Sequence, residues 1–497
     1  MINHKSHILN YPQGNKYYLF EKNKHLLITH PLLLHLIELY FDEIDIEKYI
    51  KEEKLTIEGI AYEQEETSYY YRKFLFLKKH GYFDNNNNLI STFTAESIFK
   101  SFVNTNQILF EVTERCNLNC YYCAYGDLYT PHPERKKNNL KWETVKHFYD
   151  YIIPLWEKHN TSYERIVNVY FYGGEPLLNF QLIEQIVSLF NSKKIKNITF
   201  KYGLTTNGIL LEKYMDYLID NDFYITVSID GNKQNNSYRV FPNGESSFDS
   251  LINQLDKIYK KDITYFNKNI SFNSVLHDRN TPSAIDAFLV DKYNKSSTLG
   301  DLAKTDVNKN KLKEFNAIYR PFFYYLKENE YLSLNKEKGY TYTEGKRRII
   351  THYNKYFFTS FPSLKTLSNN FRMQTGTCFP FSKKIYISSQ GHIFPCEKIS
   401  SDNILGKIDN KGVNIDYTYI ADFYTKKYAK IKKQCLKCAF NQLCKTCIYT
   451  ITVDEKGIPD CFHTKEELNT YLKGMVKHIS ENRESYIKMF NNIYTII

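Results

Sequence analysis

Short β-rich runs alternate with longer amphipathic runs between residues 107 and 293, and this alternation constrains the fold more than any other feature. The β-rich runs occupy residues 107–113, 166–172, 198–204, 223–229 and 270–276. The amphipathic runs that follow them occupy residues 141–158, 180–190, 210–220, 248–259 and 284–293. A strand followed by a helix, repeated in this way, predicts a parallel sheet covered by helices.

Units of this kind close toward a barrel, so we expect an α/β fold with a partial (βα)6-type TIM barrel over residues 106–294. In the second helix Ile183, Ile186 and Phe190 recur on one face, as packing against a sheet requires. No sixth strand can be identified in residues 295–375, which are rich in Lys, Tyr and Asn. In such barrels the functional groups lie at the carboxyl ends of the strands.

The 497 residues are enough for several domains, because one core typically organises about 150 residues. Residues 1–105 predict a small α+β domain of winged-helix-like form, with a strand at 16–21 and helical stretches at 31–40, 46–54 and 69–80. An Asn run at 85–88 marks a linker, and the alternative is an N-terminal extension packed on the barrel. The expected units after the barrel are a helical bridging region (295–375), a cysteine-rich domain (376–464) and closing helices (465–497).

The charge of the chain allows several kinds of partner and selects none. Sixty-six Lys and Arg against 55 Asp and Glu give a formal +11, spread along the chain, which suits an acidic peptide, a nucleic acid or a membrane surface. The most apolar stretch, residues 25–41, is interrupted by histidines and Glu38, so it predicts a buried helix rather than a membrane span. The first residues lack the features of a secretory signal. We therefore expect a cytoplasmic protein with no membrane partner.

Ten cysteines in a reducing cytosol predict metal or redox chemistry rather than a disulfide framework. Directly after the first barrel strand, Cys116, Cys120 and Cys123 are spaced C-x3-C-x2-C on one loop. Thiolates select iron–sulfur clusters or zinc, and a cluster held by three cysteines leaves one iron open for a substrate or cofactor. The alternatives are a zinc site completed by a distant histidine, or buried thiols without a metal.

This motif resembles that of the radical S-adenosylmethionine (SAM) superfamily, and the resemblance covers most of residues 107–290. It implies a 4Fe-4S cluster whose open iron binds the amino and carboxylate groups of SAM, with Tyr122 at the aromatic position whose backbone meets the adenine. The second strand ends in a similar Gly-Gly-Glu motif. Gly173 and Gly174 allow close backbone approach there, and Glu175 can accept from the methionyl ammonium. Gly-Gly-Glu-Pro is also a common turn before a helix.

The next two strands also end in polar residues. Thr206 and Asn207 follow the third strand and offer short polar groups to a ribose or methionine. Ser228 and Asp230 end the fourth strand, and Arg239 lies further along the chain; the three resemble family positions around the polar groups of SAM or the substrate. The alternative for each is strand-end capping and turn chemistry.

The seven remaining cysteines resemble the SPASM extension of peptide-modifying radical SAM enzymes, which carries two auxiliary 4Fe-4S clusters. When the ligand positions of the family are carried over to this sequence, the first cluster has the ligands Cys378, Cys396 and Cys447. The second has the ligands Cys435, Cys438, Cys444 and Cys461. The last spacing is x2 where the family usually has x3, and no eighth cysteine is present, so the first cluster has an open iron or a non-cysteine ligand. The alternative is a four-cysteine zinc ribbon with loose thiols.

Glu397 directly follows Cys396, as an acidic residue does in relatives where it serves as a base near the substrate. The alternative is a surface carboxylate. His392, just after Gly391, predicts only a hairpin residue.

The resemblance implies that an electron donor such as ferredoxin or flavodoxin drives cleavage of SAM to a 5′-deoxyadenosyl radical. We expect maturation of a ribosomally made precursor peptide, by thioether or carbon–carbon crosslinks, with residues 1–105 as a leader-peptide recognition domain. One alternative is a sulfatase-type maturase that oxidises Cys or Ser to formylglycine. Another, from a different class, is a zinc-organised binding protein with RNA as partner. No nucleic acid is expected, since base-stacking motifs are not evident and that reading leaves Glu175 unexplained.

Overall fold

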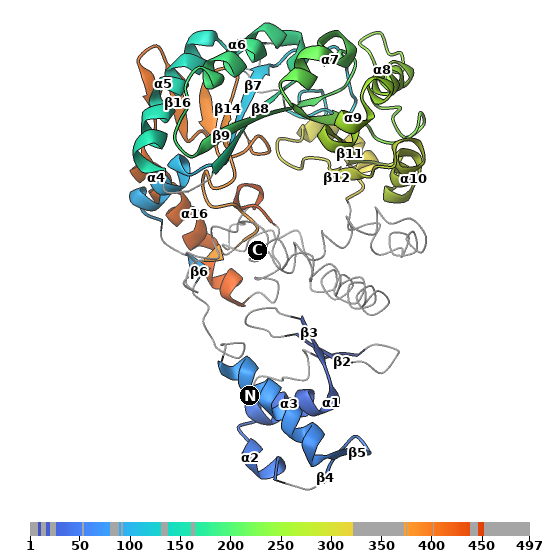
Figure 1. The fold of residues 1–497 in the computed structure, drawn as a ribbon, viewed down its shortest axis with the longest axis vertical. Coiled ribbons are helices and arrows are strands. Elements are labelled where there is room, and N and C mark those ends of the chain that lie inside the picture. Colours follow the sequence, from blue (N-terminus) through green and yellow to red (C-terminus); the bar gives the residue numbers. More distant parts are fainter. Residues whose placement is uncertain are drawn as a thin grey trace.

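The computed structural model describes twelve parts of the chain (Figure 1). They are residues 8–10, 16–19, 26–51, 54–79, 89–90, 93–130, 138–160, 165–321, 372–373, 375–400, 402–437 and 446–451. None of the helices in these ranges combines the length and apolar character needed to cross a membrane. The expected closing helices at 465–497 and most of the bridging region at 295–375 lie outside the described residues.

Six parallel strands form the centre of the largest sheet, in the order β12-β11-β10-β9-β8-β7. They are β7 (Gln107–Thr113), β8 (Arg165–Gly173), β9 (Ile198–Thr206), β10 (Tyr224–Ser228), β11 (Ile270–Leu276) and β12 (Ser297–Asp301). The five predicted strands are therefore confirmed. The sequence pattern missed β12, because Leu299 is its one large apolar residue.

Helices cover one face of this sheet (Figure 1). They are α5 (Trp142–His159), α6 (Phe180–Asn191), α7 (Leu211–Asp220), α8 (Phe248–Lys261), α9 (Ile263–Asn269) and α10 (Pro282–Tyr293). All but α9 follow the predicted pattern, and Ile183, Ile186 and Phe190 are buried in the shared core as expected. Ile108 and Phe110 of β7 face the same core, whereas Leu109 packs on the opposite, concave face. The structure is thus an α/β fold with an open, partial barrel.

The C-terminal part of the chain extends the sheet beyond β7. Strand β14 (Ile385–Ile387) pairs in parallel with β7, and β15 (His392–Phe394), β16 (Gly406–Asp409) and β17 (Gly412–Asn414) continue in antiparallel order. His392 begins the second strand of a hairpin, as its sequence context predicts. Helix α16 (Tyr417–Lys437) packs beside α4 (Ala95–Val103). One continuous sheet therefore joins the barrel strands to the segment that carries Cys378 and Cys396.

The N-terminal elements form a lobe of their own (Figure 1). Strands β1 (Ile8–Asn10), β2 (Lys16–Leu19) and β3 (Leu26–Thr29) make an antiparallel sheet, and α1 (Pro31–Phe41) packs on α3 (Gln64–Lys79) through Leu33, Ile37 and Phe74. The predicted helix at 46–54 is wrong in its second half. Helix α2 ends at Tyr49, and β4 (Lys54–Ile57) forms a hairpin with β5 (Ile60–Glu63) through positive-φ residues Glu58 and Gly59.

Helix α4 lies within the predicted N-terminal unit but packs in the barrel core. A capping box of Thr94 and Ser97 starts the helix, and its buried residues Ile98 and Phe102 belong to the same core as β7 and α5. A short pairing of β6 (Leu89–Ile90) with β13 (Arg372–Met373) precedes it. The N-terminal lobe with its own core therefore covers a shorter stretch than residues 1–105.

Candidate functional site

The loop that follows β7, residues 114–130, carries three of the predicted ligands and is called the cysteine loop below. The Cys123 amide donates to the Cys120 carbonyl (3.0 Å), which folds the loop into a turn. Burial raises the pKa of Cys120 to about 12, and the neighbouring thiols Cys123 and Cys116 contribute in the same direction. The loop therefore brings the three sulfur atoms near one another.

The three thiols form a soft donor set on one loop. Within the described ranges, no group of three or more His, Cys, Asp and Glu side chains is arranged to hold a metal ion. A polynuclear cluster places each thiolate on a different iron, so its ligands need not converge on one point. Three soft donors on one loop are the donor set that such a cluster prefers.

The Gly-Gly-Glu turn at the end of β8 packs directly against the start of the cysteine loop. A Cβ on Gly173, whose φ is +140°, would lie 2.0 Å from the carbonyl oxygen of Thr113, and one on Gly174 would lie 2.3 Å from that of Arg115. The Glu175 amide donates to the Arg115 carbonyl at 2.8 Å. Both glycines are thus required by the approach of the chain's own backbone.

Glu175 is fully buried and accepts hydrogen bonds from three donor groups. Its carboxylate accepts from the Thr206 hydroxyl (2.8 and 2.9 Å), the Asn207 amide (2.8 Å) and the Leu177 amide (3.0 Å). Burial raises its pKa to about 7, although these donors lower it. The bond to Leu177 also caps the short 3₁₀ turn at Pro176–Asn179, so the predicted turn role is present. A carboxylate has about four acceptor positions, and the four contacts from these three donor groups occupy them.

Thr206 and Asn207 connect Glu175 to the cysteine loop. The Asn207 side-chain amide donates to Asn117 (2.7 Å) and lies 3.6 Å from the Cys116 sulfur. The ends of β8 and β9 therefore meet the first thiol, as the parallel order of the strands requires.

A second buried polar group surrounds Tyr122. Its hydroxyl donates to Asp230 and accepts from the Arg239 guanidinium at 3.0 Å, and the rings of Tyr122 and His277 stack at 5.5 Å. Burial opposes ionisation of Asp230, but His277, Arg239 and the Tyr122 hydroxyl bring its pKa below the usual range. Arg239 also interacts electrostatically with Cys120. The structure thus unites three predicted residues behind the cysteine loop.

The sequence interpretation missed His277, which follows β11 directly, and its place at a strand end was the available signal. Ser228 ends β10 in register with Asn273, half-buried on the concave face, and is not one of the residues around Tyr122 described above.

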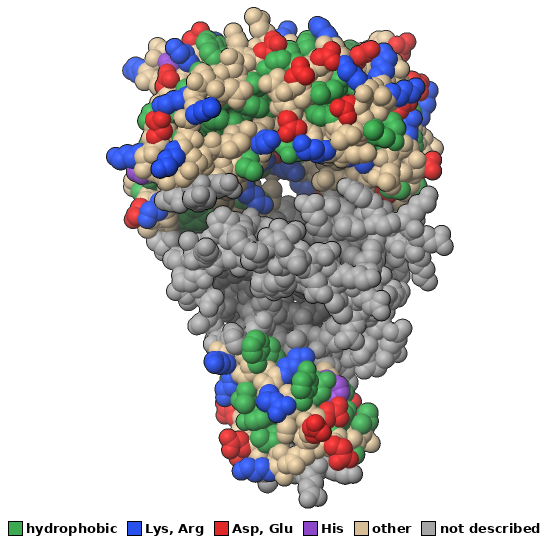
Figure 2. Space-filling model, viewed as in Figure 1, with side chains coloured by type: hydrophobic (Ala, Val, Ile, Leu, Met, Phe, Trp, Pro, Cys, Tyr) green, Lys and Arg blue, Asp and Glu red, His purple; other side chains and the backbone are tan. Residues whose placement is uncertain are grey.

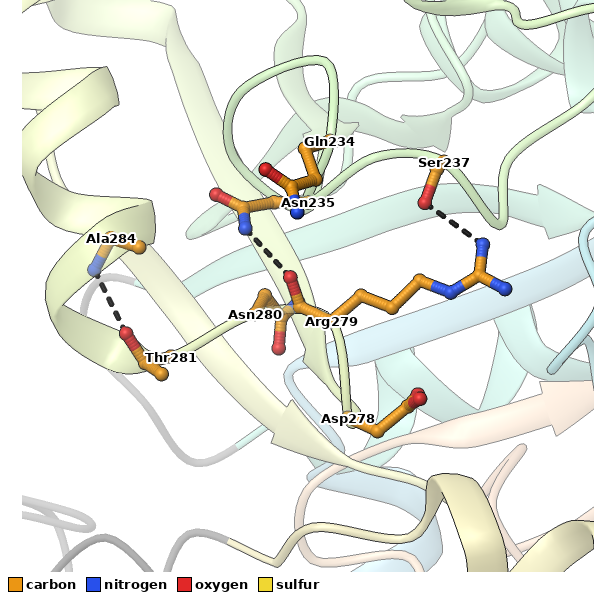
Figure 3. A pocket seen from close by; sticks show the side chains of 8 residues that line it. All are labelled: Gln234, Asn235, Ser237, Asp278, Arg279, Asn280, Thr281 and Ala284. Atoms are coloured by element: carbon orange, nitrogen blue, oxygen red, sulfur yellow. Dashed lines mark hydrogen bonds between the residues drawn. The ribbon is translucent and has the colours of Figure 1, made fainter.

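A polar pocket of about 540 Å³ lies beside this group (Figure 3). Its lining residues are Gln234, Asn235, Ser237, Asp278, Arg279, Asn280, Thr281 and Ala284. Arg279 lies 3.8 Å from the centre of the Tyr238 ring and donates to Ser237 (3.0 Å), while the Asn235 side chain donates to the Arg279 carbonyl (2.7 Å). Seven of the eight lining residues have polar side chains, although apolar atoms make up the larger part of the lining surface.

The first set of C-terminal thiols also comes together. The Ile448 amide donates to the Thr377 hydroxyl at 2.7 Å, which holds the segments of Cys378 and Cys447 side by side. Burial raises the pKa of Tyr449, and nearby Cys447 and Cys396 raise it further. Cys435 is buried in α16, and its predicted partners Cys438, Cys444 and Cys461 lie outside the described residues.

Glu397 is largely enclosed, with 12% of its side chain exposed. It accepts from the Lys384 ammonium (3.0 and 3.2 Å) and from the Cys396 thiol (3.4 Å). Burial opposes its ionisation, but the charge of Lys384 brings its pKa below the usual range. The carboxylate is therefore held in its ionised form beside a predicted ligand.

Comparison with known proteins places these features in a family. The radical SAM superfamily model matches residues 110–290. The radical SAM cyclopropyl synthase TigE of Paramaledivibacter caminithermalis is 30% identical over 214 residues, 41% of this chain and 42% of that protein. The cysteine-type anaerobic sulfatase-maturating enzyme of Clostridium perfringens strain 13 is 24% identical over 391 residues, 76% of this chain and 96% of that protein.

A solved structure of native anSMEcpe with bound AdoMet and Cp18Cys peptide has the same fold, with a TM-score of 0.51 and 18% identity. The match covers 78% of this chain and 99% of that one. The chain spans less than half the length of the first three curated relatives, namely 46%, 42% and 43%. The family match contains the cysteine loop, the Gly-Gly-Glu turn and the residues around Tyr122. Residues 110–290 of this chain therefore form a domain of the radical SAM superfamily, homologous to that of the anaerobic sulfatase-maturating enzymes and TigE.

Proposed function

We propose that this protein is a radical SAM maturase that modifies a ribosomally made precursor peptide. The observation that carries the proposal is the contact of the cysteine loop with the Gly-Gly-Glu turn, which brings Cys116 next to buried Glu175 through Asn207. Bound SAM and a 4Fe-4S cluster supply a 5′-deoxyadenosyl radical for hydrogen abstraction. Cys116, Cys120 and Cys123 hold the cluster, and Glu175 accepts from the methionyl ammonium of SAM.

The remaining predicted contacts surround this centre. The Tyr122 backbone would meet the adenine of SAM, and the Tyr122 side chain is held inward by Asp230 and Arg239. Thr206 and Asn207 orient Glu175, and Ser228 faces the concave side where a substrate enters. The protein's own task is to orient the reactants and to exclude water that quenches a radical.

The C-terminal segment supplies a SPASM-type domain in this proposal. Cys378, Cys396 and Cys447 hold a first auxiliary 4Fe-4S cluster. The nearness of Cys447 and Cys396 to Tyr449, and of Cys378 to Cys447, supports this. The second cluster has the ligands Cys435, Cys438, Cys444 and Cys461. A ferredoxin or flavodoxin supplies the electrons.

The N-terminal lobe recognises the leader of the precursor. An antiparallel sheet of three short strands offers edges to which an extended peptide can add as a further strand. Thioether or carbon–carbon crosslinks in the core of the precursor are the expected products.

A second candidate is oxidation of Cys or Ser to formylglycine, as a sulfatase-type maturase carries it out. Glu397 favours this candidate, because it is enclosed, ionised by Lys384 and adjacent to Cys396. The match with the sulfatase-maturating enzyme over 76% of this chain supports it equally. Mass spectrometry separates the two products: a crosslink loses hydrogen and keeps the sulfur of cysteine, whereas formylglycine made from cysteine has lost it.

Metal analysis of protein purified without oxygen tests the proposal. About twelve irons with matching sulfide support three 4Fe-4S clusters. One or two zinc ions per chain without iron would contradict the proposal and favour the zinc-organised binding protein.

A further inference from the structure

Two buried glutamates, one in β7 and one directly after it, meet the tip of the β14–β15 hairpin at the concave side of the sheet. Glu111 is 1% exposed and lies in β7, and Glu114 is 8% exposed and begins the cysteine loop. The hairpin tip contributes Ser389. Strand β14 pairs in parallel with β7, with Ile387 opposite Phe110, so the hairpin tip and the cysteine loop leave the sheet at the same edge.

Glu111 joins two segments that are far apart in the sequence. One carboxylate oxygen accepts from the hydroxyl of Tyr125, two residues after Cys123 in the cysteine loop. The other accepts from the backbone amide of Ser389 at 3.0 Å. A single carboxylate in β7 therefore bonds both the loop of the first three thiols and the hairpin.

Ser389 makes a second bond, to the neighbouring glutamate. Its hydroxyl donates to Glu114 at 2.6 Å, and the other oxygen of Glu114 accepts from the Asn138 amide at 3.1 Å. Buried carboxylates are costly without donors, so these bonds keep the hairpin tip close to β7.

The hairpin leads directly to one of the auxiliary thiols. Strand β15 ends at Phe394, and Cys396 follows two residues later. The turn itself is tightly held, since Gly391 has a φ of +78° and a Cβ there would lie 2.6 Å from the Ile408 carbonyl oxygen. A shift of the hairpin tip thus moves the segment that carries Cys396.

We propose that Glu111 is a positioning residue that clamps the cysteine loop to the β14–β15 hairpin and so fixes Cys123 relative to Cys396. This proposal rests on the proposed function in one respect, namely that Cys123 and Cys396 are cluster ligands. Its structural part, the coupling of Tyr125 to Ser389 through Glu111, is independent of any reaction.

Hydrogen exchange of the Ser389 amide in the anaerobically reconstituted full chain tests the clamp. In Tyr125→Phe, Glu111 loses its bond to the loop, and we expect the Ser389 amide to exchange about tenfold faster. The matched control is Tyr129→Phe, which removes a hydroxyl from the same loop, but one that donates to the Ala303 carbonyl at 3.1 Å. The control should leave exchange at Ser389 unchanged.

Unchanged exchange at Ser389 in Tyr125→Phe, or an equal increase in both variants, would overturn the clamp. If Tyr125→Phe does not fold, Glu111→Gln provides the same test. It keeps the volume of the side chain but replaces one acceptor oxygen with a donor, and exchange should rise both at Ser389 and in residues 123–126.

A second measurement connects the clamp to turnover. In Tyr125→Phe, the ratio of modified peptide to 5′-deoxyadenosine should fall several-fold, while in Tyr129→Phe it should match wild type. A wild-type protein that forms no 5′-deoxyadenosine contradicts the proposed function alone, because the exchange experiment still decides the clamp.

Discussion

At the scale of single residues, the site depends on one buried acid. Glu175 is enclosed by donors from Leu177, Thr206 and Asn207, yet burial still raises its pKa to about 7. The sequence indicates Glu175 through its position after two glycines. The burial of its side chain and its hydrogen bonds to the end of β9 could not be inferred, because they depend on how β8 and β9 pair.

The raised pKa of Glu175 predicts a pH-dependent stability in protein free of SAM. A carboxyl with a folded pKa of about 7 and an ordinary value of 4.5 binds more protons when folded. Protonated Glu175 therefore adds about 3 kcal/mol to the free energy of unfolding. This contribution is complete below pH 4.5 and is lost as the pH rises through 7. Thermal denaturation at pH 5 and pH 7.5 should show a larger loss in wild type than in Glu175→Gln. Equal losses would contradict the account.

Glu397 is the residue that separates the two candidate reactions. If it is the base of a formylglycine-type oxidation, Glu397→Gln should lower product formation by about 10²- to 10⁴-fold. Formation of 5′-deoxyadenosine should persist, because Glu397 lies beside Cys396 and not at the cysteine loop. Chromatographic quantification of both products checks this. An unchanged product yield would exclude Glu397 as the base.

At the scale of elements, apolar periodicity was sufficient to predict five strands and the helices that follow them. It works there because each strand of a parallel sheet is buried on the helix-covered face. The edge strand β12 has one large apolar residue and gave no such signal. The stretch 46–54 has apolar spacing that suits a helix, yet the turn at Glu58 and Gly59 pairs its end with β5. At both places pairing with a neighbouring strand, rather than apolar spacing, decides the structure.

The junction of β8 with the cysteine loop gives a prediction about glycine. Gly173→Ala should strongly lower the thermal midpoint, because its Cβ would lie 2.0 Å from the backbone oxygen of Thr113. Gly244→Ala is the matched control, since Gly244 also has a positive φ, +86°, but no atom within 4 Å of its Cβ position. The control should lose only about 1 kcal/mol from backbone strain. Similar midpoints for the two variants would contradict the packing described here.

At the scale of the whole molecule, the cysteine spacing predicted two thiol-rich segments, and the sheet explains how they meet. Strand β14 adds to β7 in parallel, which no local pattern indicated, since the two strands lie far apart in the sequence. The exposed charges of the described residues are interspersed on the face seen in Figure 2, consistent with the spread of charge along the chain.

The N-terminal lobe gives a prediction about domain roles. Its core of Leu33, Leu36 and Phe74 is separate from the barrel core, which includes α4. Deletion of residues 1–79 should therefore leave reductant-dependent 5′-deoxyadenosine formation within about twofold of wild type while abolishing turnover of a precursor with its leader. Mass spectrometry of the precursor after equal reaction times checks this. Unchanged turnover would contradict the role in leader recognition.

Reductant-dependent cleavage of SAM tests the central claim most directly. The wild-type protein, purified and reconstituted without oxygen, should form 5′-deoxyadenosine only when dithionite is added. A variant with Cys116→Ala, Cys120→Ala and Cys123→Ala, which keeps the C-terminal cysteines, should form none. Absence of 5′-deoxyadenosine from wild-type protein that holds a full complement of iron and sulfide, or its equal formation by the variant, would contradict the account.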